Sequence, residues 1–225
     1  HVKVYAGARS ATAAVIVDAS GERFIVSEDD HAMPMTADWL PLNDIADAGA
    51  VLSDLSWIEG TRATFEAARA HQVPTLVDLD MGSGRLLSDV AHLTDYVIAS
   101  APALEAFIPG RDTEHRLRSL IAQGARHVGV TRGPDGYTWM DRDGIGHHQP
   151  AFAVQARDTT GAGDAFHGAF TWALTEGYTE TECARLASAA AALSCLGLGA
   201  RSGLPTRAEL DAFLTERALA QPTGT

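Results

Sequence analysis

The sequence predicts an α/β protein with a mainly parallel central sheet and helices on both of its faces. Short apolar runs of strand length alternate with longer segments of helical periodicity between residues 50 and 131. Strands that are separated by helices pair in parallel, and a parallel sheet is covered on both faces. Apolar residues make up 46% of the 225 residues, enough for one sizeable core. We therefore expect a single domain over residues 1–225.

Two extended segments near the start of the chain predict a β-hairpin. Residues 12–17 and 23–26 are rich in apolar and β-branched side chains, and a polar turn signal at 18–22 separates them. The alternation of strands and helices follows. We expect strands near 50–53 and at 74–78, 95–99 and 127–131, with helices at 60–71, 85–92, 102–108 and 113–124.

The last third of the chain is predicted to be mainly helical, after a short antiparallel region. Glycine-containing turns at 133–136 and 141–144 place antiparallel strands within 136–156. Threonine followed three residues later by glutamate is the capping-box pattern, and it occurs at Thr179–Glu182 and at Thr206–Glu209. The expected helices are 162–176, ended by Gly177, then one from the first box to about 196, and 207–218.

Charge and cysteine content restrict the partners of the protein. The formal net charge of −12 argues against nucleic acid and anionic membranes. Cys183 and Cys195 lack zinc-ligand spacing, so we expect buried, reduced thiols. No apolar stretch has the length of a membrane span, and the start of the chain carries no export signal. These features favour a cytoplasmic protein that binds small molecules.

Lysine is almost missing from the chain. Of the 17 Lys and Arg residues only Lys3 is a lysine. A Walker phosphate loop, a protein kinase and a pyridoxal phosphate enzyme each need a lysine at a defined position further along the chain. These three classes are therefore excluded, and phosphate charge has to be balanced by a divalent metal, a helix N-terminus or arginine.

Residues 158–170, Asp-Thr-Thr-Gly-Ala-Gly-Asp-Ala-Phe-His-Gly-Ala-Phe, join a glycine-rich turn to a helix. Gly161 and Gly163 allow the backbone to approach a ligand closely, and the apolar spacing that follows is helical. Free amides at a helix start, together with the helix dipole, bind anions. Asp164 lies in the same first turn, where it can accept a proton from an attacking hydroxyl. The segment is typical of phosphoryl transfer.

This segment closely resembles the C-terminal signature of the ribokinase-like (PfkB) carbohydrate kinases, which transfer the γ-phosphate of ATP to a sugar or nucleoside hydroxyl. The resemblance implies that Asp164 is the catalytic base and that backbone at Gly161, Ala162 and Gly163 forms the anion hole. It also implies a three-layer α/β/α fold with a small β lid, to which residues 12–26 partly belong. A homodimer is expected, since lids in this family often pair between subunits.

The resemblance covers nearly the whole chain but is incomplete at its front. The family's N-terminal paired-glycine motif and early aspartate, which bind the sugar, do not appear before Val4. We therefore expect that the N-terminal part of the family domain is absent from these residues.

The expected substrate is a ketose or a modified ketohexose, fructose-like or sulfofructose-like. The layout around Arg9, Gly-Ala-Arg-Ser-Ala-Thr-Ala-Ala-Val-Ile-Val-Asp, looks most like the ketohexokinase and sulfofructose kinase branch. Arg9 could pair with an anionic substituent of the substrate, and surface solvation is the competing explanation.

The residues leave other functions open. Nucleoside kinases and 2-keto-3-deoxygluconate kinases share the motif. A non-catalytic homologue that binds sugar or nucleotide is a further alternative, because Pro102 and Ser188 stand where relatives often carry asparagine. The intact Asp164 argues against it.

The resemblance also assigns nucleotide and magnesium positions. Thr131, Gly133 and Gly136 follow a predicted strand, where the family's loop lies against the nucleotide; a plain turn is the alternative. Ser188 is assigned to the same nucleotide site. Glu105 resembles the glutamate of the family's Asn-x-x-Glu element, which organises Mg²⁺ through water, and a solvated helix residue is the alternative. The expected cofactors are ATP and Mg²⁺.

A monovalent cation is a further expectation. Asp158 and Thr160 match positions that help hold K⁺ in potassium-activated relatives, where carbonyls near Ala200 and Ser202 complete the cage. Members of the family differ in this requirement, so the resemblance leaves K⁺ dependence open.

Three more titratable side chains are candidates for the site. Asp78 and Asp80 close an apolar strand, at the end where open α/β sheets bind ligands. They could contact substrate or position other groups, and solvation of the strand end competes with both roles. His167 shares a helix face with Asp164 and could touch nucleotide or substrate, but the role of base is already assigned to Asp164.

Overall fold

Six strands form the central sheet of the protein, in the order β3-β4-β5-β6-β7-β8. The computed structural model describes residues 1–17, 23–28, 33–82 and 84–220. The strands of this sheet are β3 (Val51–Ser53), β4 (Thr75–Leu79), β5 (Tyr96–Ser100), β6 (His127–Thr131), β7 (Tyr137–Asp141) and β8 (Gly146–Gln149). Pairing is parallel from β3 to β6 and antiparallel from β6 to β8. The expected mainly parallel sheet with an antiparallel edge is confirmed.

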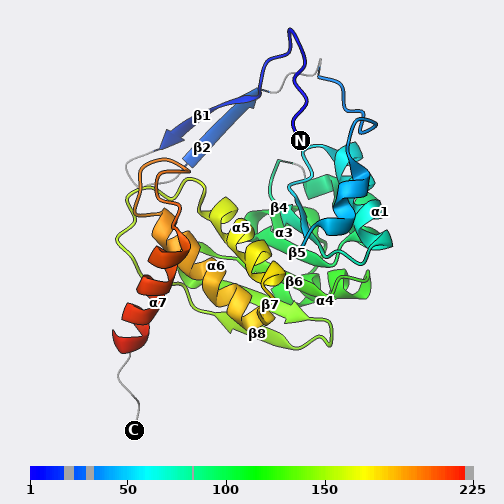
Figure 1. Ribbon diagram of the computed structural model, residues 1–225. Coiled ribbons are helices and arrows are strands. Elements are labelled where there is room, and N and C mark those ends of the chain that lie inside the picture. The colour runs from blue at the N-terminus through cyan, green and yellow to red at the C-terminus, as the bar shows by residue number, and fades with distance from the viewer. Residues whose placement is uncertain (18–22, 29–32, 83, 221–225) are drawn as a thin grey trace.

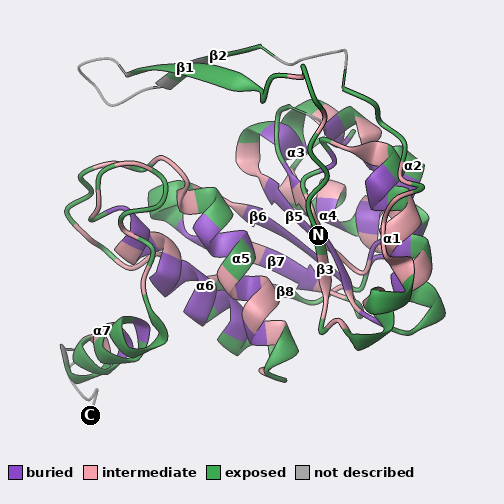
Figure 2. Ribbon diagram, turned by 45° about the horizontal axis from the view of Figure 1, so that its top comes forward, coloured by how far each residue is buried: buried purple, intermediate pink, exposed green. Residues whose placement is uncertain are grey.

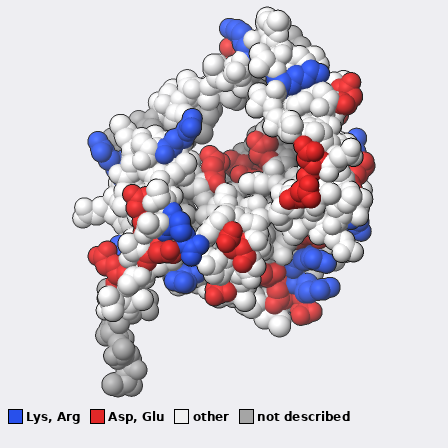
Figure 3. Space-filling view, viewed as in Figure 1, with Lys and Arg blue, Asp and Glu red and all other residues white. Residues whose placement is uncertain are grey.

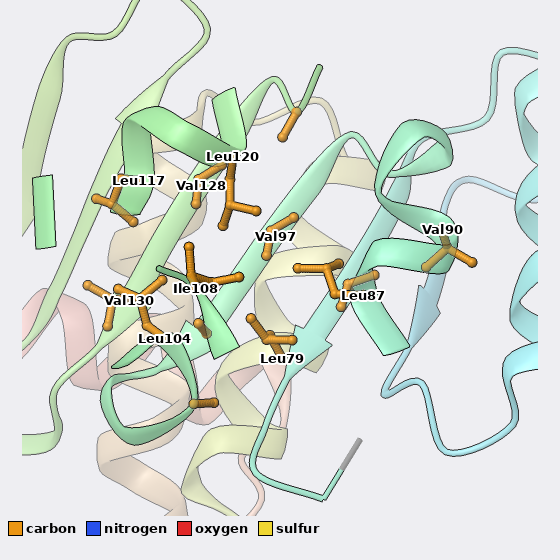
Figure 4. Packing of buried hydrophobic residues seen from close by; sticks show 14 of the residues in the cluster. Leu79, Leu87, Val90, Val97, Leu104, Ile108, Leu117, Leu120, Val128 and Val130 are labelled. Atoms are coloured by element: carbon orange, nitrogen blue, oxygen red, sulfur yellow. The ribbon is translucent and has the colours of Figure 1, made fainter. Parts of the chain in front are cut away.

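Helices cover both faces of this sheet (Figures 1 and 2). They are α1 (Ile58–Ala70), α2 (Leu87–Val90), α3 (Ala101–Phe107), α4 (Thr113–Ala122), α5 (Ala162–Thr175), α6 (Glu180–Ser194) and α7 (Arg207–Ala220). One buried cluster packs α1 to α4 against the sheet and contains Val77, Leu79 and Val97 (Figure 4). A second cluster packs α5 to α7 against the opposite face and contains Leu76 and Ile98. The three-layer α/β/α architecture is therefore confirmed.

The alternation of side chains along β4 positions the site. Leu76 belongs to the cluster on the α5 face and Val77 to the cluster on the other face. Successive side chains of a strand point to opposite faces, so Asp78 points to the α5 face. The carboxyl ends of β4, β5 and β6 meet at one edge, and α5 begins there.

A separate two-stranded hairpin projects over the body (Figure 1). Strands β1 (Thr12–Val17) and β2 (Arg23–Glu28) pair antiparallel, with Thr12 opposite Glu28. The expected hairpin is confirmed, and its turn at 18–22 lies outside the described residues. Several apolar side chains of the hairpin are exposed, among them Ile16 at 59% and Phe24 at 66%.

The expected helix at 85–92 is wrong as a continuous element. A 3-10 turn at Gly84–Leu86, the short helix α2 and a second 3-10 turn at Ala91–Leu93 take its place. The buried residues of this segment, Leu87, Val90 and Leu93, recur every third residue. That spacing fits three residues per turn better than the 3.6 of an α-helix. A 3-10 helix at Leu42–Asp47 was not predicted.

The antiparallel region is shorter than expected, and its last strand contains His147 and His148. β8 ends at Gln149, directly before Pro150, which has no amide hydrogen to extend the ladder. His147 lies in β8 and stacks on Trp139. Both predicted capping boxes are formed, at Thr179–Glu182 and at Thr206–Glu209. Cys183 and Cys195 are buried and are not joined in a disulfide, as expected. In the part of the chain that the structure describes, no helix is long and apolar enough to cross a bilayer.

Candidate active site

The glycine-rich turn before α5 has a conformation that requires glycine at one position. Gly161 caps the helix with φ 78° and ψ 5°, in the left-handed region that residues with a Cβ rarely adopt. A Cβ on Gly161 would also lie 2.7 Å from the Cβ of Ala200. The left-handed turn and this close approach explain why glycine precedes the helix.

The side chain of Asp158 connects this turn by hydrogen bonds to the loop that follows α6. Its Oδ1 accepts a hydrogen bond from the amide of Thr160 at 2.9 Å, and its Oδ2 accepts one from the amide of Gly199 at 2.8 Å. The amides of Arg157 and Asp158 donate to the carbonyl of Cys195. The side chain of Asp158 therefore fixes the backbone of the turn, and a role for Asp158 and Thr160 in binding K⁺ stays a prediction.

The first turn of α5 presents backbone amides to open space. The amide of Ala162 donates to the carbonyl of Thr159, so it is already used within the turn. The amides of Gly163 and Asp164 have no acceptor four residues back inside the helix. Gly163 is exposed, and a Cβ built on it would meet no atom within 4 Å. The space beside Gly163 therefore suits an anion that approaches the backbone closely.

Asp164 lies at the meeting point of two cavities. One cavity of about 470 Å³ is lined by residues of the β3 end, α1, β4 and α5. Its lining residues are Val51, Leu52, Ser53, Asp54, Trp57, Gly60, Thr61, Thr64, Asp78, Asp164 and His167. We call it the acidic cavity. A second cavity of about 560 Å³ extends from Asp164 between α5, α6 and residues 200–210. Figure 3 shows acidic side chains at the floor of the hollow below the hairpin.

Asp78 and His167 form a buried pair beside Asp164. Their side chains are 16% and 5% exposed, and Nδ1 of His167 lies 3.2 Å from Oδ2 of Asp78. Burial raises the pKa of Asp78 to about 6, and the charge of Asp164 acts in the same direction, while His167 lowers it. The sequence left solvation of Asp78 open; the structure places this carboxyl inside the acidic cavity.

His167 makes two more contacts to backbone oxygens. Its Nδ1 lies 2.7 Å from the carbonyl of Gly163, in the first turn of its own helix. Its Nε2 lies 3.2 Å from the carbonyl of Ile98 on β5. His167 thus connects the start of α5 to two strands of the sheet. Asp80, which directly follows β4, accepts a hydrogen bond from the hydroxyl of Ser100.

The positions assigned to the nucleotide do not line either cavity. Thr131 ends β6, and its hydroxyl donates to the carbonyl of Ala99. Gly133 and Gly136 lie at the two ends of the expected turn. A Cβ on Gly136 would lie 2.3 Å from the carbonyl oxygen of Gln149. Ser188 is buried on α6. None of these four residues lines the two cavities that Asp164 borders, so their contact with a nucleotide stays a prediction.

Glu105 and Arg9 also lie outside those cavities. Glu105 is exposed on α3, which begins at the same sheet edge. Arg9 pairs with Glu28 of the hairpin at 3.4 Å, and both side chains are largely exposed. Among the described residues, no group of three His, Cys, Asp or Glu side chains could hold a metal ion.

Several lining residues of the acidic cavity were not found from the sequence. The hydroxyls of Ser53 and Thr61 are hydrogen-bonded to each other at 2.6 Å, Asp54 follows β3 directly, and Trp57 is the N-cap residue of α1. The one available signal was their position after a short apolar strand, at the edge where α/β sheets bind ligands.

Comparison with known sequences agrees with this geometry. The sequence model of the pfkB family carbohydrate kinases matches residues 1–207. Deoxyribokinase of Salmonella typhi is 32% identical over 150 residues, which cover 64% of this chain and 46% of the relative. Ribokinase of Lactococcus lactis is 31% identical over 128 residues, 57% of this chain and 41% of the relative. The chain thus spans less than half the length of these two relatives.

Solved structures extend the likeness to the fold. A presumed ribokinase of Agrobacterium tumefaciens is 34% identical with a TM-score of 0.87, over 96% of this chain and 71% of that one. Ribokinase of Arabidopsis thaliana, complexed with ribose and ATP, is 26% identical with a TM-score of 0.74, over 90% and 68%. Because the family's sequence model accounts for most of the chain and the fold agrees over nearly all of it, the chain belongs to the pfkB family of carbohydrate kinases.

Proposed function

We propose that this protein transfers the γ-phosphoryl group of ATP to a hydroxyl of an uncharged sugar, with Asp164 as general base. The observation that carries the proposal is the position of Asp164, which lies in the first turn of α5 and also lines the acidic cavity. A hydroxyl bound in that cavity would lie beside the carboxylate, and the transferring phosphate would lie beside the amides of the helix start.

Each group of the helix start has a separate task in this reaction. The carboxylate of Asp164 accepts the proton of the sugar hydroxyl while the hydroxyl oxygen attacks the γ-phosphorus, and the bond from that phosphorus to the β–γ bridging oxygen breaks, so that ADP leaves. The amides of Gly163 and Asp164 donate to the oxygens of the transferring group, where negative charge accumulates. The hydrogen bonds from the amides of Thr160 and Gly199 to the carboxylate of Asp158 hold these donors in place before the substrate arrives.

ATP and Mg²⁺ are the proposed cofactors. The open space beside Gly163 fits a phosphate oxygen. Mg²⁺ bound to the nucleotide oxygens would neutralise part of the phosphate charge. Glu105 is the proposed contact to its water shell, and K⁺ at Asp158 and Thr160 is a further part of the proposal.

The charge of the acidic cavity favours a neutral substrate. Asp54, Asp78 and Asp164 line it, and neither lysine nor arginine is among its described lining residues. A carboxylate, sulfonate or phosphate on the sugar would be repelled by this field. We therefore propose that the substrate is a neutral furanose-forming sugar, a class that includes fructose, ribose and deoxyribose. Sulfofructose and 2-keto-3-deoxygluconate fit the cavity less well because they are charged. The names of the ribokinase and deoxyribokinase relatives support the same class.

A non-catalytic binding protein remains the alternative, and the products distinguish the two. The protein would be incubated with ATP, Mg²⁺ and separate pools of neutral sugars, acidic sugars and nucleosides, with mass-spectrometric detection of products. We expect phosphate on a neutral sugar, and Asp164→Asn as the inactive control. Binding of sugar or nucleotide without any phosphorylated product would support the alternative. Phosphorylation confined to acidic sugars would contradict the substrate class.

We further propose a homodimer that forms through the β1–β2 hairpin. Ile16 and Phe24 are paired across the two strands, so they lie on the same face of the hairpin. Both are more than half exposed, as is Val26, two residues along β2. Burial of this face against the hairpin of a second copy would remove exposed apolar surface from water.

A further inference from the structure

The ring of His167 is surrounded by oxygen acceptors on both of its nitrogens. Nδ1 faces the carbonyl of Gly163 at 2.7 Å and the carboxylate of Asp78 at 3.2 Å. Nε2 faces the carbonyl of Ile98 at 3.2 Å. Backbone carbonyls cannot donate, so each ring nitrogen needs a hydrogen of its own to make these contacts favourable.

Neither neutral tautomer satisfies this environment. With the hydrogen on Nε2, the lone pair of Nδ1 would point at the carbonyl oxygen of Gly163. With the hydrogen on Nδ1, the lone pair of Nε2 would point at the carbonyl oxygen of Ile98. A neutral imidazole carries only one N–H, and the side chain of His167 is too buried for water to compensate, at 5% exposed.

The charges around the ring favour the protonated form. Asp78 supplies a carboxylate in direct contact with Nδ1, and Asp54, Asp80 and Asp164 also act on Asp78. Neither lysine nor arginine is among the described residues that line this cavity. An imidazolium in contact with one carboxylate and near others is stabilised by their charge.

We propose that His167 is an imidazolium paired with the carboxylate of Asp78. The Nδ1–H of this imidazolium donates to the carbonyl of Gly163 and so orients the first turn of α5. His167 is then a positioning residue: it reaches back one helical turn to the peptide that precedes Asp164. The pair ties that peptide to β4 and β5, so the amides and Asp164 keep a fixed direction toward the acidic cavity. The effect on phosphoryl transfer rests on the proposed function, whereas the protonation state does not.

The protonation state is tested by NMR on protein with ¹⁵N-labelled histidine rings, with His167 assigned from the His167→Asn variant. At pH 7.5 a histidine with a pKa of about 6.5 is mostly neutral. We expect the two nitrogens of His167 to show the closely spaced shifts of an imidazolium, whereas a neutral ring would show two widely separated shifts. Asp78→Asn should make His167 neutral at this pH, and Asp80→Asn should not. A neutral His167 in the parent protein overturns the proposal.

The positioning role is tested by kinetics on the same variants. We expect His167→Asn to lower kcat by about tenfold or more while KM for the sugar stays within about twofold, because His167 directs the transferring groups. His115→Asn is the matched control and should keep the parent kcat. An unchanged kcat in a folded His167→Asn protein overturns the positioning role. An imidazolium in a protein without phosphoryl transfer would support the pair and contradict the proposed function.

Discussion

Gly161 and Ala200 approach each other so closely that a Cβ on the glycine would lie 2.7 Å from the Cβ of the alanine. This contact joins the turn before α5 to the loop after α6. Gly161 also has a positive φ, whereas the equally small Gly163 does not and faces open space. We therefore expect the two glycines of one motif to serve different purposes, packing in the first case and ligand access in the second.

Alanine substitutions should separate these purposes. Gly161→Ala should destabilise the fold by about 1–2 kcal/mol from the left-handed backbone alone, and further through its contact with Ala200. Gly163→Ala should keep or slightly raise the unfolding temperature, because alanine favours a helix. It should nevertheless weaken ATP turnover, since its Cβ occupies the space proposed for phosphate. Thermal unfolding and steady-state kinetics on both variants provide the measurement. Equal stability of the two variants would contradict the packing role of Gly161.

The proposed general-base role of Asp164 predicts a loss of turnover when its carboxylate is removed. Asp164→Asn should lower kcat by a factor on the order of 10² or more, because asparagine cannot accept the proton. Nucleotide affinity should stay nearly unchanged, since the backbone donors remain. Glu176→Gln at the other end of α5 removes a carboxylate without touching either cavity, and it should keep full activity. Turnover and calorimetric ATP binding are the two measurements, and full activity of Asp164→Asn would remove this residue from the mechanism.

Buried Asp78 predicts a dependence of stability on pH. Its pKa rises from 3.8 to about 6 in the folded protein, mainly through burial, so between these values the folded state binds more protons than the unfolded state. The contribution of Asp78 to stability is therefore largest at or below pH 4 and declines as pH rises to about 6, by about 3 kcal/mol at most. Asp78→Asn lacks this decline. Its stability relative to the parent should therefore increase between pH 4 and 6, as measured by denaturant unfolding. A constant difference over that range would contradict the raised pKa.

Local features of the site were predictable from the sequence, and contacts between distant segments were not. The start of α5 at Gly161 and the capping boxes at Thr179 and Thr206 depend on residues within three positions of one another, so a short pattern determines them. The pairing of Asp78 with His167 depends on which face of β4 the carboxyl occupies and on where α5 crosses the sheet. Neither is encoded in a local pattern.

The broken helix at 84–93 and the lining of the acidic cavity have the same explanation. The apolar side chains of Leu87 and Val90 are also compatible with a continuous helix, and packing of the short segment against the sheet breaks that helix. Ser53 and Thr61 became candidates only when β3 and α1 were placed together. The resemblance to a family supplied the roles of Asp164 and the turn, but it did not single out these residues.

The exposed face of the β1–β2 hairpin gives the last prediction. Phe24 is 66% exposed and Ile16 is 59% exposed, and the two side chains are neighbours across the strand pair. If this face packs against a second copy, Phe24→Asp should place an unpaired carboxylate in an apolar contact and shift the dimer toward monomer. Ile145→Asp changes an apolar side chain of similar exposure, 57%, in the turn between β7 and β8. Light scattering coupled to size exclusion should show a dimer for the parent and for Ile145→Asp, and a monomer for Phe24→Asp. A dimer that persists in Phe24→Asp would place the interface elsewhere, and a monomeric parent at micromolar concentration would contradict the dimer itself.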